Sequence, residues 1–444
     1  MENVKINRIC NILSYFTFTC VCIYTIASPK IISLDDAVRR YMSHNTEMQQ
    51  LQEHILLLEQ KTSLNQHRYY PKISPVTASF DPLSNTGTIG SGLDWQLPTG
   101  GQIKLNVNKT DEKDTQYNLQ IEQPLSQTKP AQDAQTTLQL DIDYLQHHER
   151  LEKLVLSFRQ FYRQCVQSTL ELKQQQRLLS ALHTATKKQK LLFQYGEISK
   201  IEFEKSISLL ERRSIDMLKL ERQFELDMIQ LKQQLGIDIQ QEIVLDDQIH
   251  FHEAELTPAH IMSAAYAHNR PYQISQLKQK ISALQYKAAE SEQQPKMNLI
   301  GSINQDSEAS LGVSLTFSLP SAATNYVHAQ NTLNYLQSQQ SAYQSTNDLK
   351  TKIHSDLINL IHQKSLIALS AKNLQQEQTI FQAETLKFEH NDISTEALED
   401  ASEKLESAFL ESTSAQVQYA NYYEALMQSI GQFHTLSTNE PTDE

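Results

Sequence analysis

The octapeptide at residues 192–199 reads Leu-Phe-Gln-Tyr-Gly-Glu-Ile-Ser, and a related one at residues 387–394 reads Lys-Phe-Glu-His-Asn-Asp-Ile-Ser. Both combine an aromatic residue, a Gly or Asn that tolerates a left-handed turn, and a Ser that can cap a following helix. They lie 195 residues apart, and the same offset relates Leu235-Gly236 to Ile430-Gly431. This self-similarity indicates that one structural unit was duplicated.

The front of each copy repeats at a longer spacing. A His-Asn pair and a later Pro recur at an offset of 224 residues: His44-Asn45 and Pro71 in the first copy, His268-Asn269 and Pro295 in the second. The first copy therefore carries 29 additional residues before Phe193, and they include the only Trp, Trp95. We expect the stretch at about 88–109 either to lengthen strands or to form an exposed hairpin.

Gly and Pro are scarce and clustered. Only 10 Gly and 12 Pro occur in 444 residues, and none lies between Pro130 and Gly196, between Gly196 and Gly236, or from Ser321 to Ile430. These intervals are far longer than an average soluble helix, so they predict extended helical hairpins. A helix from about Pro130 to Tyr195 would span on the order of 100 Å.

After Gly196, apolar residues recur every seven positions, and this heptad seam predicts coiled-coil packing. Its members are Phe203, Leu210, Met217, Phe224 and Leu231.

Strand patterns lie where the helical patterns stop. Apolar residues alternate with polar or small ones through Leu93, Trp95 and Leu97, and the same alternation recurs around 76–80, 103–107, 117–121, 299–303 and 311–319. This period of two predicts strands with one apolar and one polar face. The apolar face would be covered by helices in a soluble protein, or would face lipid in a transmembrane barrel with the polar face lining the lumen.

The amino terminus is typical of an export signal. Lys5 and Arg8 precede an apolar stretch at about 9–26, and Thr25-Ile26-Ala27 supplies small residues at the usual cleavage spacing. The alternatives are a membrane anchor, or lipid attachment at Cys20 or Cys22. Cleavage would leave Cys165 as the only cysteine, which excludes an internal disulfide.

Together these motifs resemble the TolC-like outer-membrane efflux protein family. The carriers, in chain order, are the duplicated Asn-to-Pro spacing, the segment Leu97-Pro98-Thr99-Gly100-Gly101, the segment Gln123-Pro124-Leu125, and the Phe-x-x-Gly-x-Ile-Ser turn followed about forty residues later by Leu-Gly. The resemblance implies a mainly α fold with a small β part, a homotrimer whose helical hairpins form a coiled-coil periplasmic tunnel, and a shared twelve-stranded barrel to which each protomer gives four strands. The first copy offers more strand-like segments than this count requires.

Five segments follow from the duplication and the resemblance. They are a signal peptide (1–27), a first repeat (28–236) with strands at about 73–123, a polar connector (237–256), a second repeat (257–431) with strands at about 297–319, and a flexible acidic tail (432–444).

The resemblance also implies that the two octapeptides form periplasmic tips to which an adaptor (membrane fusion) protein docks, linking the chain to an inner-membrane pump or ABC transporter. The tip residues are Tyr195, Gly196, Glu197, Ile198 and Ser199 in the first copy, and His390, Asn391, Asp392, Ile393 and Ser394 in the second.

Family members narrow the tunnel near these tips with acidic residues. The candidates here are Glu202, Glu396, Glu399 and Asp400, although Ala397 replaces one acid of the family pattern. In a trimer each inward carboxylate becomes a ring of three that selects cations; the other interpretation is a solvated helix face.

No enzyme signature and no cofactor motif is present. The best metal-like group, His250, His252, Glu253 and Glu255, lacks the helical two-His spacing of a zinc site, so no metal site is predicted. A formal net charge of −13 argues against nucleic acid. Two functions remain: an outer-membrane conduit for efflux or type I secretion, with lipid around its barrel, or an exported periplasmic coiled-coil scaffold without a pore.

Overall fold

The computed structural model describes residues 30–81, 86–110, 113–125, 129–249, 257–292, 294–305, 308–317, 321–390 and 392–433. Four features expected from the sequence lie wholly or mostly outside these ranges: the signal peptide (1–27), the His250 to Glu255 group, Asn391 and the acidic tail. Within the described residues, no helix combines the length and the apolar character that crossing a membrane requires.

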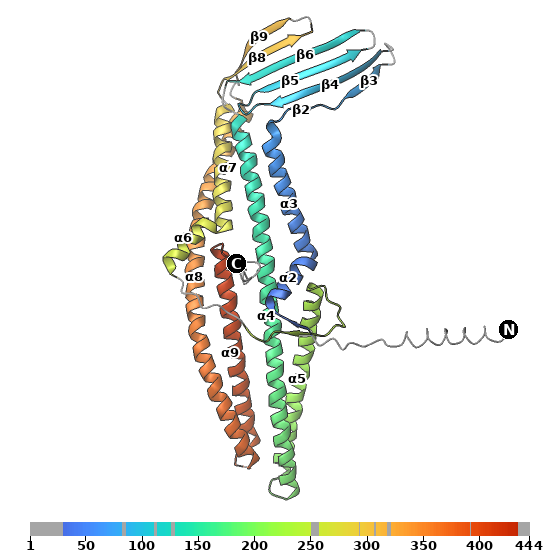
Figure 1. Cartoon of the computed structure of the whole chain (residues 1–444). Coiled ribbons are helices and arrows are strands. Elements are labelled where there is room, and N and C mark those ends of the chain that lie inside the picture. Colours follow the sequence, from blue (N-terminus) through green and yellow to red (C-terminus); the bar gives the residue numbers. More distant parts are fainter. Residues whose placement is uncertain are drawn as a thin grey trace, which may run out of the picture.

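Long helices dominate the fold, and the order of elements repeats along the chain (Figure 1). The first set comprises α2 (Leu34–His44), α3 (Thr46–Gln66), the 3-10 turn η1 (His67–Tyr69), α4 (Lys129–Gln194) and α5 (Lys200–Gln234). The second comprises α6 (Pro258–His268), α7 (Arg270–Glu292), α8 (Ala322–Glu389) and α9 (Thr395–Ser429). Helices α4 and α8 contain 66 and 68 residues, and at 1.5 Å per residue each spans about 100 Å, which confirms the length expected from the punctuation.

The repeated landmarks meet in space. Asn45 accepts a hydrogen bond from the backbone N–H of Met48, and Asn269 accepts one from Tyr272, so each Asn caps the helix that follows it. Gly236, at φ +63°, lies against His44, and Gly431, at φ +70°, lies against His268. In each copy, therefore, the His of the repeated His-Asn pair contacts the Gly of the repeated Leu-Gly or Ile-Gly pair.

Three buried clusters hold the helices together. The first joins α2, α4 and α5 around Val155, Phe158 and Leu231. The second lies towards the octapeptide ends of α4, α5, α8 and α9, and the third joins α6, α8 and α9. The heptad residue Leu231 is fully buried, whereas Phe224 is partly buried against the first cluster.

One antiparallel sheet lies at the end of the molecule opposite the octapeptides (Figure 1). Its strands are β2 (Lys72–Ile73), β3 (Thr77–Asp81), β4 (Thr86–Gln96), β5 (Gln102–Thr110), β6 (Lys113–Pro124), β8 (Lys296–Asn304) and β9 (Ala309–Thr316). The strand order is β2-β4-β5-β6-β8-β9, and β3 pairs with β4 beyond β2.

The expectation of four strands from this chain is wrong. Because β2 and β3 follow one another along the same side of β4, the sheet has six positions across, formed by seven strands. The difference is the insertion in the first copy, whose residues form most of two full-length strands, β4 and β5, instead of lengthening existing ones.

A second, smaller sheet was not expected. Strand β1 (Lys30–Ile32) pairs in parallel with β7 (Ile243–Leu245), which lies in the connector that we expected to be only polar. Ile32 and Leu245 are buried in the first helical cluster.

Candidate functional site

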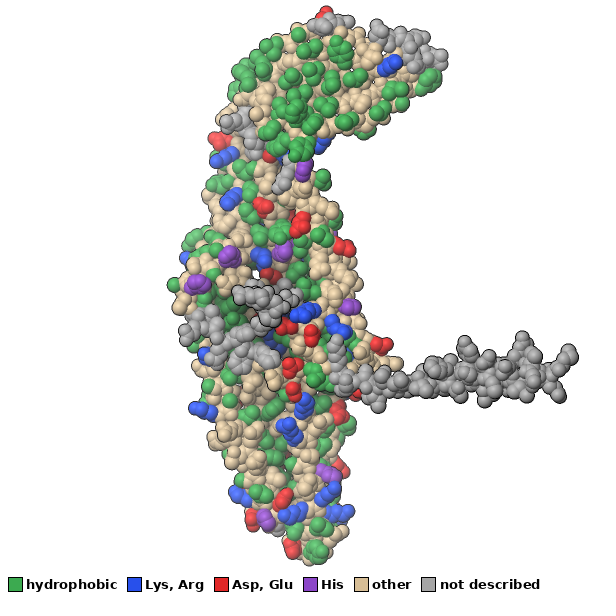
Figure 2. All heavy atoms as spheres, in the orientation of Figure 1, with side chains coloured by type: hydrophobic (Ala, Val, Ile, Leu, Met, Phe, Trp, Pro, Cys, Tyr) green, Lys and Arg blue, Asp and Glu red, His purple; other side chains and the backbone are tan. Residues whose placement is uncertain are grey.

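The large sheet has two chemically different faces. On one face lie Ile89, Leu93 and Trp95 of β4 with their cross-strand neighbours Ile103, Leu105, Val107, Tyr117, Leu119 and Ile121. The second copy continues this face through Ile303, Leu311 and Val313. These side chains are largely exposed, as Leu311 at 79% and Val313 at 61% illustrate. Figure 2 shows the resulting continuous apolar surface over the sheet.

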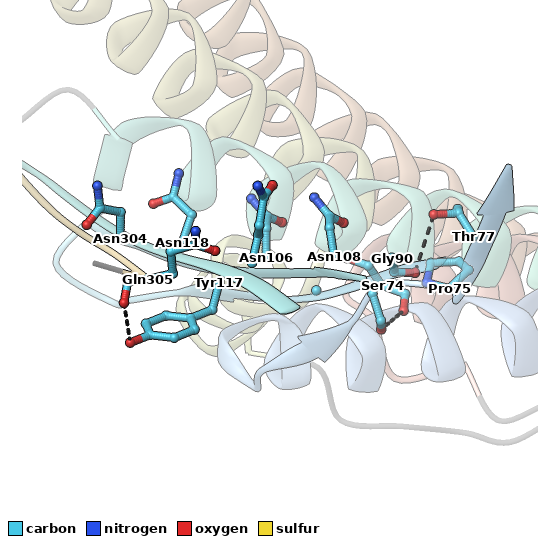
Figure 3. A pocket seen from close by; sticks show the side chains of 13 residues that line it. Ser74, Pro75, Thr77, Gly90, Asn106, Asn108, Tyr117, Asn118, Asn304 and Gln305 are labelled. Carbon is cyan, nitrogen blue, oxygen red and sulfur yellow. Dashed lines mark hydrogen bonds between the residues drawn. The ribbon is translucent and has the colours of Figure 1, made fainter. Parts of the chain in front are cut away.

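The opposite face is polar and carries a row of asparagines. Asn106 of β5 is paired with Asn118 of β6, and Asn118 with Asn304 of β8. Figure 3 shows Asn106, Asn108, Asn118 and Asn304 on the same side of the sheet, with Tyr117 on the other. A shallow hollow on this part of the sheet is lined by uncharged residues. The sheet therefore separates an apolar surface from a hydrated one.

Glycines on β4 make room for this row. A Cβ at Gly92 would lie 2.8 Å from the Asn106 Oδ1 atom, and one at Gly90 would lie 2.4 Å from the Asn108 Oδ1 atom. The asparagine side chains of β5 consequently lie over the backbone of β4. Larger residues there would displace them.

The turn between β4 and β5 is fixed to the neighbouring strand. Leu97 N donates to Gly101 O at 2.8 Å, which closes the turn, and Gly100 adopts φ +81°. Thr99 Oγ1 donates to Gln123 Oε1 at 2.8 Å, and Gln123 Nε2 donates to Thr99 O at 3.2 Å. This turn is at the helical end of the sheet and is held against β6.

The first tip, residues 195–199, is a tight turn between α4 and α5. Gly196 has φ +77°, and Ser199 and Glu202 form a reciprocal capping box at the start of α5. Tyr195 is 80% exposed, Glu197 and Ser199 are exposed, and Ile198 is buried. Of the predicted tip residues in the first copy, Ile198 therefore packs inward.

The second tip, described at residues 390 and 392–394, shares two backbone features with the first. Asp392 N donates to Lys387 O at 2.9 Å, and at an offset of 195 residues Glu197 N donates to Leu192 O at 2.9 Å. Ser394 caps α9 by accepting from Ala397 N, as Ser199 accepts from Glu202 N in the first tip. His390 and Asp392 are exposed, whereas Ile393 is partly buried.

The two tips are tied together side by side. Gln189 Nε2 of α4 donates to the carbonyl oxygen of Phe388 on α8 at 3.1 Å, and Lys188 pairs with Glu389 at 3.3 Å. The ends of both hairpins therefore present one combined surface at this end of the molecule (Figure 1).

Two of the four candidate gate carboxylates are ion-paired across the hairpins. Glu396 lies 2.5 Å from Lys205 Nζ, and this hydrogen bond, followed by the lysine charge, lowers the pKa of Glu396. Glu399 pairs with Arg212. Glu202 is engaged in the capping box, and Asp400 is exposed.

Sequence reasoning missed a buried charge cluster between the copies. Glu424 of α9 accepts hydrogen bonds from Arg159 and Arg163 of α4, with two of these at 2.8 Å, and all three residues are at most 8% exposed. Burial alone would raise the pKa of Glu424, but the hydrogen bonds and charges of the two arginines outweigh it and hold the pKa below its usual value. The only available signal was arginine on an otherwise apolar helix face, which does not identify a partner 265 residues away.

Comparison with known proteins identifies solved structures that share this fold. No protein-family model and no curated protein matches the sequence. Among solved structures, the Campylobacter jejuni CmeC outer membrane channel matches with a TM-score of 0.68 at 12% identity, covering 90% of this chain and 86% of that one. The outer membrane protein VceC of Vibrio cholerae matches with a TM-score of 0.67 at 11% identity, covering 90% and 96%.

The chain has the fold of an outer-membrane channel. The Neisseria gonorrhoeae MtrE outer membrane channel, described in its open state, also shares it, with a TM-score of 0.59 at 12% identity over 91% of this chain and 90% of that one. The TolC-like resemblance drawn from the sequence motifs is thereby confirmed at the level of the fold.

Proposed function

We propose that this chain is the outer-membrane channel-tunnel of a tripartite efflux or type I secretion system, and that it conducts solutes passively, without enzymatic activity or a cofactor. The observation that carries the proposal is the two-faced sheet placed at one end of helices about 100 Å long. An apolar face this exposed requires a cover. Lipid is such a cover, and the polar face then lines a water-filled passage.

A closed wall requires further copies of the chain. Both lateral edges of the sheet, β2 with β3 on one side and β9 on the other, lack a neighbour among the described residues. Unpaired edges cannot persist in lipid, because every backbone group there must be satisfied within the protein. Since successive positions alternate in direction, the two edge strands run opposite to each other, and copies around an axis can join antiparallel. A homotrimer, as in the family resemblance, is the assembly we propose.

The combined tip surface is the proposed docking site for a periplasmic adaptor. In a channel inserted at the sheet end, the tips are the part that reaches farthest towards the inner membrane and its pump. Exposed Tyr195, Glu197, His390 and Asp392 offer side chains to a partner.

We also propose that Glu202, Glu396, Glu399 and Asp400 narrow or gate the passage near the tips. The pairing of Glu396 with Lys205 and of Glu399 with Arg212 leaves Asp400 as the acid with the most freedom to face the axis. No nucleic acid partner is proposed, since the chain is acidic.

The alternative is a periplasmic coiled-coil scaffold. It accounts for the helices but gives no reason for an exposed apolar sheet face backed by an asparagine row. The conduit accounts for both.

Fractionation and conductance test the proposal. We expect the full-length protein in the outer-membrane fraction as a heat-modifiable oligomer, and ion conductance when the purified oligomer is added to planar bilayers. A soluble periplasmic dimer without conductance would instead establish the scaffold.

A further inference from the structure

We infer that the hairpin β4–β5 is part of the wall of the pore, so that three copies of this chain close an eighteen-stranded barrel with a wide pore, whose middle is lined by uncharged polar residues and suits bulky polar solutes. The inference rests on the proposed trimeric conduit and adds the width and lining of its pore. It departs from the twelve strands that the family resemblance implies.

The hairpin is continuous with the rest of the sheet. Strand β4 pairs with β5 without a break from Thr88–Thr110 to Gln96–Gln102, and β5 pairs with β6 from Gln102–Glu122 to Asn108–Gln116. The turn at residues 97–101 is held to β6 by the reciprocal Thr99 and Gln123 hydrogen bonds. An excursion away from the wall would leave β6 with an open edge.

The apolar face and the polar face of the sheet both continue through the hairpin. Leu93, Trp95 and Leu105 continue the apolar face of β6, whereas Asn106 and Gly92 continue the row formed by Asn118 and Asn304. If water covered both faces of the hairpin, nothing would favour an alternation of apolar and polar residues in register with that of β6.

Closure follows from counting positions. Six positions are an even number, so β3 and β9 run in opposite directions and can pair between copies in an antiparallel ring. Pro75 interrupts the edge between β2 and β3, and an edge is where a strand tolerates Pro. Three copies give eighteen strands. With strands about 4.8 Å apart and tilted by about 40°, the backbone diameter is about 36 Å, compared with about 24 Å for twelve strands.

The lining determines what such a pore favours. Away from the helices, the described polar face consists mostly of Asn, Gln, Ser, Thr and Gly (Figure 3). Asp94, Lys104 and Glu122 of this face lie on its helical side, level with the turn at 97–101. At the other end, strands β3 and β6 carry further charged residues, Asp81, Lys113 and Asp114. The middle of such a pore is therefore lined by uncharged polar residues, and charged residues lie towards both of its ends.

Two adjacent cysteine variants test whether the hairpin is in the wall. In membranes, we expect Asn106→Cys to react rapidly with a membrane-impermeant, charged thiosulfonate reagent and Val107→Cys, on the opposite face, to be protected by lipid at least tenfold. The wild-type protein, whose Cys165 is buried, gives the background. Equal, rapid reaction of both variants would mean an exposed hairpin and would overturn the inference.

Spin-label distances test the strand count. For Asn118→Cys labelled in the purified oligomer, the distance between symmetry-related backbones is about 31 Å in an eighteen-stranded barrel and about 21 Å in a twelve-stranded one. Asn106→Cys is a second site should Asn118→Cys assemble poorly. A membrane trimer with the shorter distance would overturn this inference and leave the proposed conduit intact, whereas a soluble, non-trimeric protein would overturn the conduit itself.

Discussion

The helical body and the sheet differ in where they put their apolar side chains. The body buries them in three clusters, and Phe158, Leu231, Leu398 and Leu426 are at most 2% exposed. In the described part of the large sheet, by contrast, no large apolar side chain is buried, and those of β9 are mostly exposed. The body therefore buries its apolar side chains within one chain, whereas in the proposed channel lipid and neighbouring copies would cover those of the sheet. Substitutions should consequently act through different properties in the two regions.

The largest effect is expected at the charge cluster in the body. Glu424→Gln removes the carboxylate that Arg159 and Arg163 share and leaves the more distant, partly exposed Asp35 carboxylate, 3.9 Å from Arg159, as the neighbouring negative charge. Breaking a buried pair in this way costs about 3–5 kcal/mol. Urea unfolding followed by helical circular dichroism measures this loss. The matched control is Glu403→Gln, because Glu403 is 60% exposed and pairs with Arg213 at the surface, where the loss should be at most about 1 kcal/mol.

The stability difference between the wild-type protein and Glu424→Gln should also depend on pH. Because the pKa of Glu424 is lowered in the folded state, its contribution is present above the usual carboxyl pKa and is lost as the pH falls through the lowered value. The wild-type protein should therefore lose its advantage over Glu424→Gln in acid. A constant difference between pH 7 and pH 3 would contradict this role.

In the sheet we expect an effect on insertion. Leu119→Lys places a charge on the apolar face, which costs about 2–4 kcal/mol near the middle of a bilayer. The yield of membrane-inserted oligomer should fall, while the helical content of the recovered chain stays normal. Asn118→Lys, one residue away on the polar face, is the control and should insert nearly as well as wild type. Equal insertion of both variants would contradict the assignment of one face to lipid and the other to water.

The two glycine contacts in the body should respond differently to rescue. Gly236→Ala and Gly431→Ala each introduce a Cβ at positive φ and should destabilise by about 1–2 kcal/mol. The three atoms nearest to the new Cβ at position 236 belong to the side chain of His44, so adding His44→Ala should recover part of the loss. At position 431 it meets backbone atoms of His268, so His268→Ala should recover less. Thermal unfolding of the single and double variants gives the comparison, and identical rescue would contradict it.

The smallest effect on stability is expected at the first tip. A Cβ at Gly196 has nothing within 4 Å, so Gly196→Val costs only the backbone strain of φ +77°, about 1 kcal/mol. We expect normal amounts of membrane oligomer, but weaker crosslinking to the adaptor and greater sensitivity to exported compounds. Lys200→Ala, in the first turn of α5, is a control for changes near the tip that keep the turn. Normal transport at normal abundance by Gly196→Val would remove the tip from the docking surface.

Local patterns in the sequence predicted most elements of the fold. The long intervals without Gly or Pro predicted α4, α5, α8 and α9, and period-two alternation predicted the strands of the large sheet. The pairs that were missed join distant residues: β1 with β7, and Arg159 and Arg163 with Glu424. Neither Lys30–Ile32 nor Glu424 differs locally from a loop or a helix surface, so only the folded chain reveals the partner. The insertion was located from the changed offset, but its place in the sheet depends on pairing that no local pattern encodes.

Native mass spectrometry of the protein extracted from outer membranes in mild detergent tests the central claim most directly. Among the described residues, β3 and β9 have no strand paired to their outer edges, which neighbouring copies cover in the proposed channel. The account therefore predicts three chains per particle without heating and single chains after heating. A particle containing one chain that retains its full β content would show that the sheet closes or is covered without partners, and would contradict the account.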